Sequence, residues 1–420
     1  MNRPDVEVSF DHAFDVAKWL IGKRRFTQAI GLLKQLNAAE PYLIPVLTVL
    51  STALQRVGQV EEAAHGLYRA MVIQPGLSKL HFNLANLWRL RGSLGQAIDR
   101  YRLAAELDPE DSELRAGLAL ALMEAGRWSE GFAEYEWRAS RRKFLDRVDR
   151  TKIELWRPDL ARGKSVLLVS EQGAGDVVQF IRYAKVIADS GFTVHVLCPQ
   201  NLVRLIATAP GVTSAGAVSP AQFDTIEQIM SLPYRLGLTP DNIEPAVPYL
   251  RSPDQPPHQL PPRGRPKIGL VWAGNPRHVR DHLRSCPLRT LVPLIDDDRF
   301  EFFSLQFGAK SQEVASHAQR IQNLAPHLRD FADTAAMIAQ LDLLISVDTV
   351  VAHVAGALGR PVWLLLSASA DWRWLTQGQS TAWYPTMRLF RQTRLDDWDG
   401  VVAQVHEELR RTYEGAIVPH

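Results

Sequence analysis

Cysteine is scarce in this sequence of 420 residues, since only Cys198 and Cys286 occur. They lie far apart without the spacing of metal ligands, which argues against a thiolate zinc site. One disulfide is conceivable, but we favour two reduced thiols, as in a cytosolic protein. No apolar run approaches the roughly 20 residues that a membrane-spanning helix needs. The opening MNRPDVEVSF carries acids early and does not resemble a signal peptide, so we expect a cytoplasmic location.

An excess of either charge is also missing, because the formal net charge is only +2. This balance argues against a nucleic-acid partner held by bulk electrostatics. Hydrophobic residues make up 46% of the chain and charged residues 22%, as in ordinary soluble globular proteins. At roughly 100 to 200 residues per domain, a chain of this length predicts two or three domains.

Residues recur at intervals of 34 in the first third of the chain. Four registers keep this interval: Pro41, Pro75 and Pro109; Gly58, Gly92 and Gly126; Ala29, Ala63 and Ala97; and Leu20, Leu54, Trp88 and Leu122. The period and the small residues resemble the tetratricopeptide repeat, a helix–turn–helix unit. We place the glycine in the turn, the alanine where two helices approach closely, and the proline at the start of the next unit.

These intervals predict a helical repeat domain over residues 1–150, with less regular units at its ends. The concave face of such an array usually holds an extended or helical peptide, which favours a protein or peptide partner. The alternative is that the helices only brace the next domain. The predicted units span residues 10–41, 44–75, 78–109 and 112–143.

The stretch from Arg138 to Lys152 holds five arginines and two lysines among few apolar residues. We interpret it as a solvated helix end or connector, with phosphate binding as the alternative.

From Lys164 onward the pattern alternates between short apolar strands and helices, which predicts two Rossmann-like α/β halves. The stretch 251–266 has six prolines and is the predicted linker, so the halves are expected at 151–255 and 256–420. Ligands of such folds bind at the carboxyl ends of the strands, which predicts a cleft between the halves. The predicted strands are 165–170, 193–198, 211–217, 223–230, 267–274, 300–308, 341–347 and 361–366, and predicted helices follow residue 176 and span 202–209 and 332–341.

A tight turn and a small-residue helix follow the strand at 341–347, and this βαβ pattern favours a phosphate site at the helix start. Thr349 offers a hydroxyl, and His353 lies four residues on, at the same helix face. The alternatives are that Asp348 only caps the helix and that His353 is a satisfied interior histidine. A carboxylate repels phosphate, so Asp348 suits a cap, a ribose partner or a histidine partner better than a phosphate ligand.

Other candidates lie on loops after strands. Asp176 follows the turn Gly173-Ala174-Gly175 and suits either a general base or a helix cap. Gln306 ends a strand at the same rim, where it suits a nucleotide base or a diphosphate. Arginines after the strand at 267–274 suit a diphosphate leaving group. That loop contains Asn275, Arg277, His278, Arg280, Arg284 and Ser285.

Two further groups point to simpler roles. Asp296-Asp297-Asp298 matches a cation-binding pattern but precedes a strand, so we interpret it as a solvated turn. An aromatic group beyond the last βαβ strand suits core and cleft wall, with Trp372 close enough to the rim to form that wall. Its members are Trp372, Trp374, Trp383 and Tyr384.

Several strings together resemble bacterial tetratricopeptide-repeat glycosyltransferases, with a catalytic region similar to the heptosyltransferases of glycosyltransferase family 9. The resemblance implies a GT-B architecture, a nucleotide-sugar donor held mainly by the second half, and no metal or other cofactor. The chain departs from it at RHVRDHLR, which lacks the expected lysine, and at FDTIEQIMSLP. The strings are EQGAGDVVQFIRYA, GLVWAGNP, RSCPL, FFSLQ, FADTAAMIAQLDLLISVDTVVAHVAGALGRPVW and DWRW…WYPTMRLFRQ.

The resemblance assigns the role of general base to Asp176 and implies an inverting displacement. The function it implies is transfer of a sugar to a hydroxyl acceptor, by analogy a protein or peptide bound by the repeats. The alternatives are a non-catalytic interaction scaffold that binds a nucleotide sugar, and a nucleotide-sugar epimerase. The predicted donor-binding residues are Gln172, Gly173, Gly175, Asn275, Arg284, Ser285, Gln306, Asp348, Thr349, Val350 and His353.

Overall fold

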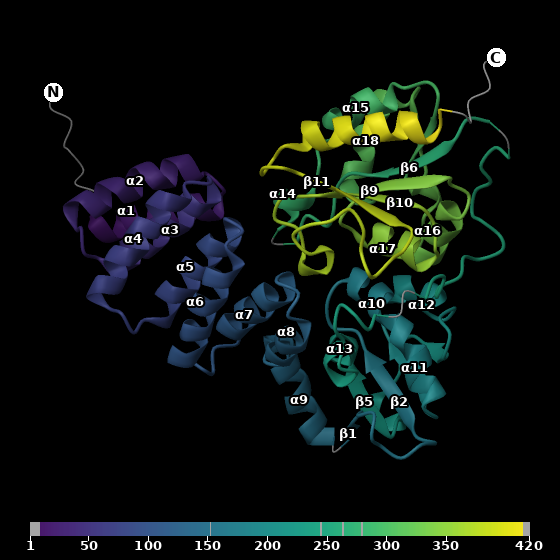
Figure 1. Cartoon of the computed structure of the whole chain (residues 1–420), viewed down its shortest axis with the longest axis horizontal. Helices are drawn as coiled ribbons and strands as arrows, with labels where there is room; N and C mark the ends of the chain where they lie inside the picture. Colours follow the sequence, from purple (N-terminus) through teal and green to yellow (C-terminus); the bar gives the residue numbers. More distant parts are fainter. Residues whose placement is uncertain (1–8, 152, 244–245, 263, 279, 415–420) are drawn as a thin grey trace. The chain divides into compact units, whose positions relative to one another are not determined.

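The computed structural model describes residues 9–151, 153–243, 246–262, 264–278 and 280–414. The chain forms two compact units, of which the first ends at Ala139 and the second begins at Ser140 (Figure 1). The first unit therefore ends before the predicted residue 150. The reason is that helix α9 (Ala139–Thr151) packs Phe144 and Val148 against Leu167 and Ile226 of the second unit.

The first unit consists of helices in successive pairs. The first helices of the pairs start at Phe10, Ile44, Ser78 and Ser112, which confirms the predicted period of 34. The turns within the last three pairs hold Gly58, Gly92 and Gly126 at φ of +77°, +81° and +76°, a conformation that favours glycine. The helices are α1 (Phe10–Gly22), α2 (Phe26–Ala39), α3 (Ile44–Arg56), α4 (Val60–Ile73), α5 (Ser78–Leu90), α6 (Leu94–Leu107), α7 (Ser112–Glu124) and α8 (Trp128–Tyr135).

Small residues let these helices approach closely, as the repeat pattern predicted. Ala29, Ala63 and Ala97 are fully buried at the helix contacts. Leucines at the recurring positions fill the space between the helices, and burial of each such side chain contributes about 2 kcal/mol. The predicted helical repeat array is thus present in the structure.

The second unit begins with a five-stranded parallel sheet in the order β1-β5-β2-β3-β4. Its helices include the predicted one after residue 176, which is interrupted by a 3-10 turn at Ile181–Tyr183. The strands are β1 (Glu154–Leu155), β2 (Ser165–Val169), β3 (Thr193–Leu197), β4 (Val212–Ala215) and β5 (Thr225–Gln228). The helices after α9 are α10 (Ala174–Phe180), α11 (Ala184–Asp189), α12 (Gln200–Ile206) and α13 (Leu232–Arg235).

A second parallel sheet follows in the same unit, with six strands in the order β11-β10-β9-β6-β7-β8. The buried strands β9 and β10 are joined through α17, which confirms the predicted βαβ element. The strands are β6 (Lys267–Val271), β7 (Glu301–Ser304), β8 (Ile321–Asn323), β9 (Leu343–Val347), β10 (Val362–Leu366) and β11 (Met387–Arg391). The helices are α14 (Asp281–Arg284), α15 (Leu288–Ile295), α16 (Phe331–Ile338), α17 (Val350–Ala357) and α18 (Trp398–Thr412).

The proline-rich stretch connects the two sheets. Its described residues between 251 and 266 form neither helix nor strand, because proline removes backbone donors and fixes φ. Helix α10 of the first sheet packs against α17 of the second, and α12 packs against α16 (Figure 1). Cys198 and Cys286 are buried free thiols, so the structure contains no bond between them.

Candidate active site

A cavity of about 740 Å³ lies between the two sheets of the second unit. The turn after β2 forms one side of it. The loops after β6, β7 and β9 form the other side, so both walls are built at the carboxyl ends of parallel strands.

Most of the predicted site residues line this one cavity. Ser285 and Trp372 are not among its lining residues. The predicted residues that do line it are Gln172, Gly173, Gly175, Asp176, Asn275, Arg284, Gln306, Asp348, Thr349, Val350 and His353.

Asp176 is held at both carboxylate oxygens. The N–H of Gly173, the N-cap of α10, donates to Oδ2 at 2.8 Å in a capping-box arrangement. Arg373 donates to Oδ1. The side chain is 16% exposed. Burial raises the pKa of Asp176, and the Arg373 guanidinium opposes this rise. Asp176 therefore stabilises the helix start as the capping alternative foresaw, although as the third helical residue rather than the cap itself.

Arg373 connects the two walls. Its Nε donates to Gln179 Oε1 at 2.5 Å, and Nη1 donates to Asp371 Oδ1 at 2.8 Å. The guanidinium also stacks on Trp372, with 4.5 Å between its central carbon and the ring centre. Trp372 is buried, contacts Arg373 through its ring and is not among the lining residues of the cavity, so the structure does not place it as the predicted cleft wall.

Sequence reasoning missed Asp371 and Arg373 because it treated DWRW as an aromatic group. The available signal was the alternation of an acid and a base with the two tryptophans, just beyond a strand that ends at the rim. The same cavity wall includes Arg329, Asp330 and Phe331, which were also missed.

The turn after β9 places Asp348, Thr349 and the start of α17 on the cavity. Thr349, not Asp348, is the N-cap residue, so the capping alternative for Asp348 is wrong. Burial and the nearby Asp371 carboxylate raise the pKa of the half-buried Asp348, while Arg284 opposes the rise. The first N–H groups of α17 point out of the helix start, where an anion is favoured.

His353 is 5% exposed and still lines the cavity. Its Nδ1 lies 2.9 Å from the hydroxyl of Tyr384, and its ring stacks on Trp374 at 5.4 Å. Burial, with a further contribution from Arg373, lowers the pKa of His353 to about 3. The imidazole is therefore neutral at physiological pH. Its Nδ1 has a buried partner, as the interior alternative foresaw, and the ring is also part of the cavity wall.

The loop after β6 is organised by polar side chains. Ser285 accepts from the Gly274 N–H at 3.0 Å and donates to Asp281 at 3.1 Å, so it shapes the loop from outside the cavity. Gln306 accepts from the N–H groups of Trp272 and Ala273 and donates to the Ala273 carbonyl. Because these bonds occupy the amide, Gln306 positions the loop, and the predicted contact with a base or diphosphate remains untested.

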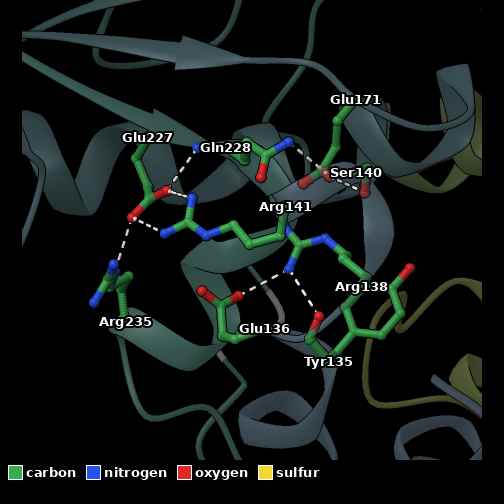
Figure 2. A network of polar contacts seen from close by, with 9 residues as sticks. All are labelled: Tyr135, Glu136, Arg138, Ser140, Arg141, Glu171, Glu227, Gln228 and Arg235. Carbon is green, nitrogen blue, oxygen red and sulfur yellow. Dashed lines mark hydrogen bonds and ion pairs between the residues drawn. The ribbon is translucent and has the colours of Figure 1, made fainter. Parts of the chain in front are cut away.

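The basic stretch at the start of the second unit is not a solvated connector throughout. Figure 2 shows Arg141, which is 2% exposed, and Arg235 on the fully buried Glu227 carboxylate. Beside this group, Glu171 accepts from Ser140 at 2.8 Å and from Gln228 at 2.9 Å. Helix α9 is thereby fixed to the carboxyl edge of the first sheet, next to the cavity residue Gln172.

The aspartate triplet is likewise only partly a solvated turn. Asp297 is buried and contacts Arg299, His406 and Arg410. Hydrogen bonds from Arg299 and, to a smaller extent, from His406 lower the pKa of Asp297 despite its burial. In the described parts of the chain, no three or more His, Cys, Asp or Glu side chains are grouped to hold a metal ion.

Comparisons with known proteins find similarity to one family model and to one curated relative. Residues 307–380 match the model of glycosyltransferase family 9 (heptosyltransferase), and this match supports a glycosyltransferase. Protein FlbA of Caulobacter vibrioides is 24% identical over 460 residues, which span 97% of this chain and 73% of FlbA. The family match covers the cavity wall from Phe307 through Arg373.

Solved structures resemble a part of the chain. A crystal structure of MamA has a TM-score of 0.31 at 15% identity and covers 34% of this chain and 83% of its own. MamA of Desulfovibrio magneticus RS-1 has a TM-score of 0.29 at 12% identity, with 35% and 78% covered. Among the described helices, none is both long enough and apolar enough to cross a membrane.

Proposed function

We propose that the second unit is a GT-B glycosyltransferase similar to the heptosyltransferases, which transfers a sugar from a nucleotide-sugar donor to a hydroxyl acceptor. The supporting observation is one cavity with a carboxylate, Asp176, on the first-sheet wall and an anion-favouring helix start on the other. The family match covers the part of that second wall from Phe307 onward, which includes the start of α17.

On the donor side, the first N–H groups of α17 and the guanidinium of Arg284 would bind the phosphates. As the bond from the anomeric carbon to the phosphate oxygen breaks, the electron pair leaves with the nucleotide. Fixed donors at this place stabilise the developing charge without reorganisation, so the proposed reaction needs no metal ion.

On the acceptor side, Asp176 would accept the hydroxyl proton while the acceptor oxygen bonds to the anomeric carbon from the opposite face, with inversion. A carboxylate has about four acceptor positions, so the two bonds of Asp176 leave capacity for this proton. Arg373 favours the ionised carboxylate and so opposes the rise of the Asp176 pKa that burial causes. The repeat array would supply the binding surface for a protein or peptide acceptor.

The test is Asp176→Asn in the full chain, incubated with cell extract and UDP-, GDP-, ADP- or CMP-sugars while released nucleotide is measured. We expect turnover to fall by about a hundredfold to ten-thousandfold, the usual contribution of general base catalysis. Asparagine retains an oxygen for the Gly173 N–H, so the chain should still fold and bind nucleotide.

Asp297→Asn is the matched control, because it also removes a buried, arginine-paired carboxylate but lies outside the cavity. It should lower stability and leave turnover per folded molecule unchanged. Full turnover by Asp176→Asn would rule out the assigned base.

A second function is a non-catalytic scaffold that binds a nucleotide sugar. The observation that favours it is that Asp176 already accepts from both Arg373 and Gly173. This function predicts thermal stabilisation by a nucleotide sugar with no nucleotide release in any extract, in the wild type as well as in the variant.

A further inference from the structure

We propose that Tyr384 holds His353 in the neutral tautomer with its proton on Nε2, and that this N–H is the hydrogen-bond donor that His353 presents to a phosphate in the cavity. Tyr384 is then a positioning residue. The identity of the ligand as a nucleotide phosphate rests on the proposed function, whereas the tautomer does not.

The first observation is a buried polar chain behind His353. The Tyr384 hydroxyl lies 2.9 Å from His353 Nδ1 and 3.4 Å from the Tyr249 hydroxyl. Tyr249 in turn donates to the Val178 carbonyl at 3.0 Å and accepts from Arg182 at 3.0 Å. Each hydroxyl has one proton to donate, so the proton positions in this chain depend on one another.

Arg182 sets the direction of these protons. It is buried, and its hydrogen bonds go to the Gln179 and Trp383 carbonyls and to Tyr249. In the described part of the chain it forms no ion pair with a carboxylate, and the groups that act on its pKa besides burial are tyrosines. Its unneutralised charge lies close to the Tyr249 and Tyr384 rings, at 4.5 Å and 4.9 Å from their centres.

A buried cation attracts oxygen lone pairs and repels hydroxyl protons. The Tyr249 proton therefore points to Val178, and the Tyr384 proton points to the nearer acceptor, His353 Nδ1. A neutral imidazole that accepts at Nδ1 carries its proton on Nε2.

The Nε2 edge of the ring lies next to Gly175, and both residues line the cavity. A Cβ added to Gly175 would lie 3.0 Å from His353 Cδ2 and 3.5 Å from Nε2, so this edge is next to a residue of the same cavity. Glycine at position 175 leaves room there. One face of the ring stacks on Trp374.

Burial keeps the ring neutral, and most of the charges around it add to this effect. Arg182, Arg284 and Arg373 disfavour the imidazolium, and Asp371 opposes them from a side chain that is 35% exposed. Asp176 faces the same cavity but contacts Arg373. A neutral imidazole N–H suits a phosphate because it can donate a hydrogen bond without the ring first taking up a proton.

The first experiment is a long-range ¹H–¹⁵N spectrum of the full chain with labelled histidine, with the His353 signal assigned by its loss in His353→Gln. We expect the Nε2–H tautomer and no titration between pH 8 and pH 5. An Nδ1–H tautomer or an imidazolium at pH 7 would overturn the proposal, and this readout needs no variant beyond the assignment.

Two phenylalanine variants then separate the members of the chain. Tyr384→Phe removes the donor to Nδ1 and should shift His353 toward a tautomer mixture. Tyr249→Phe keeps that donor and should leave the tautomer unchanged. If His353 Nδ1 instead donated to the Tyr384 hydroxyl, and the Tyr384 proton pointed to the Tyr249 oxygen, Tyr249→Phe would disturb the tautomer, and the assigned direction would be wrong.

The last step adds UDP, GDP, ADP or CMP to the labelled protein. We expect the Nε2–H signal to shift when one of these nucleotides is added. Tyr384→Phe should lower the affinity for that nucleotide by about threefold to tenfold, the effect of one net hydrogen bond. A nucleotide that binds without moving the signal would contradict the phosphate contact. Loss of turnover in every assay, with this shift intact, would instead contradict the proposed transfer reaction.

Discussion

Two regions of the second unit bury arginine side chains. In one region a carboxylate compensates the arginine charge, and in the other no carboxylate is bonded to it in the described residues. At α9 and β5, the fully buried Glu227 carboxylate contacts both Arg141 and Arg235 (Figure 2). Behind the cavity, Arg182 is surrounded by carbonyl oxygens, hydroxyl groups and aromatic rings, without a carboxylate bonded to it in the described residues.

The presence or absence of a compensating carboxylate indicates whether a buried arginine serves stability or ligand binding. A buried ion pair contributes to folding stability when its charges compensate each other and their hydrogen bonds are satisfied. A buried cation without an anion reduces stability but extends a positive potential toward the neighbouring cavity. We therefore infer that the Glu227 region fixes α9 to the sheet, and that the Arg182 region favours an anionic ligand at His353.

The largest expected effect comes from breaking the compensated region. Glu227→Gln keeps the side-chain volume but removes the charge that both arginines contact, which should lower the free energy of unfolding by about 3 to 5 kcal/mol. Urea unfolding of the full chain, followed by tryptophan fluorescence, measures this change. A loss of unfolding free energy below about 1 kcal/mol would show that water reaches this region, and that Glu227 does not compensate buried arginine charges.

Arg182→Met should have a smaller effect on stability, about 1 to 2 kcal/mol. The substitution removes three hydrogen bonds, but it also removes a charge that had no anion beside it. The free energy of nucleotide binding, measured by calorimetry, should fall by more than the free energy of unfolding does. Equal losses of stability in Arg182→Met and Glu227→Gln would remove the distinction between the two regions.

Periodic features were predictable from the sequence, and long-range pairing was not. The 34-residue period and the apolar runs predicted the helix pairs and the β9–α17–β10 element, because periodicity reports which face is buried. Glu227 and Arg141 are far apart in the sequence, so nothing local indicated that the two charges meet. The basic stretch was therefore interpreted as solvated.

The site was predictable where a residue follows a strand directly. Asp348 and Thr349 come straight after β9, Asp176 lies in the first turn of the helix that follows β2, and all three line one cavity. Arg373 and Arg329 lie on segments whose path depends on packing, so their place in the wall could not be found from spacing. Gln306 lies two residues beyond the end of β7 rather than at the end of a strand, and its amide is bonded to the backbone, which the sequence does not indicate.

The pH dependence of stability sharpens the comparison, because the cavity also holds a poorly compensated carboxylate. Asp348 has a folded-state pKa above its ordinary 3.8, chiefly through burial. The unfolded chain therefore loses this proton first, and ionised Asp348 reduces stability as the pH rises above about 4. Asp348→Asn should remove that loss and raise the melting temperature at pH 7, an effect measured by scanning calorimetry across pH 4 to 8.

Asp297 serves as the control. Its pKa is lowered, so its effect on stability as the pH rises has the opposite sign to that of Asp348. Its contribution is present above the ordinary carboxyl pKa of 3.8 and is lost as the pH falls below it. Asp297→Asn should thus destabilise at pH 7. A lower melting temperature for Asp348→Asn at pH 7 would mean that its carboxylate is compensated after all.

The smallest expected change in stability tests how tightly the cavity wall packs. Gly175 and Gly95 are both the second residue of a helix, in α10 and α6, and alanine at either should gain up to about 1 kcal/mol in helix propensity. A Cβ at Gly95 has no neighbour within 4 Å, whereas at Gly175 it lies 3.0 Å from His353 Cδ2. Gly95→Ala should therefore stabilise, and Gly175→Ala should show a net change near zero because the contact with His353 offsets the gain. The decisive readout for Gly175→Ala is the His353 Nε2–H signal, which should move although the melting temperature does not; an unchanged signal would mean that the ring edge is not held against the α10 backbone.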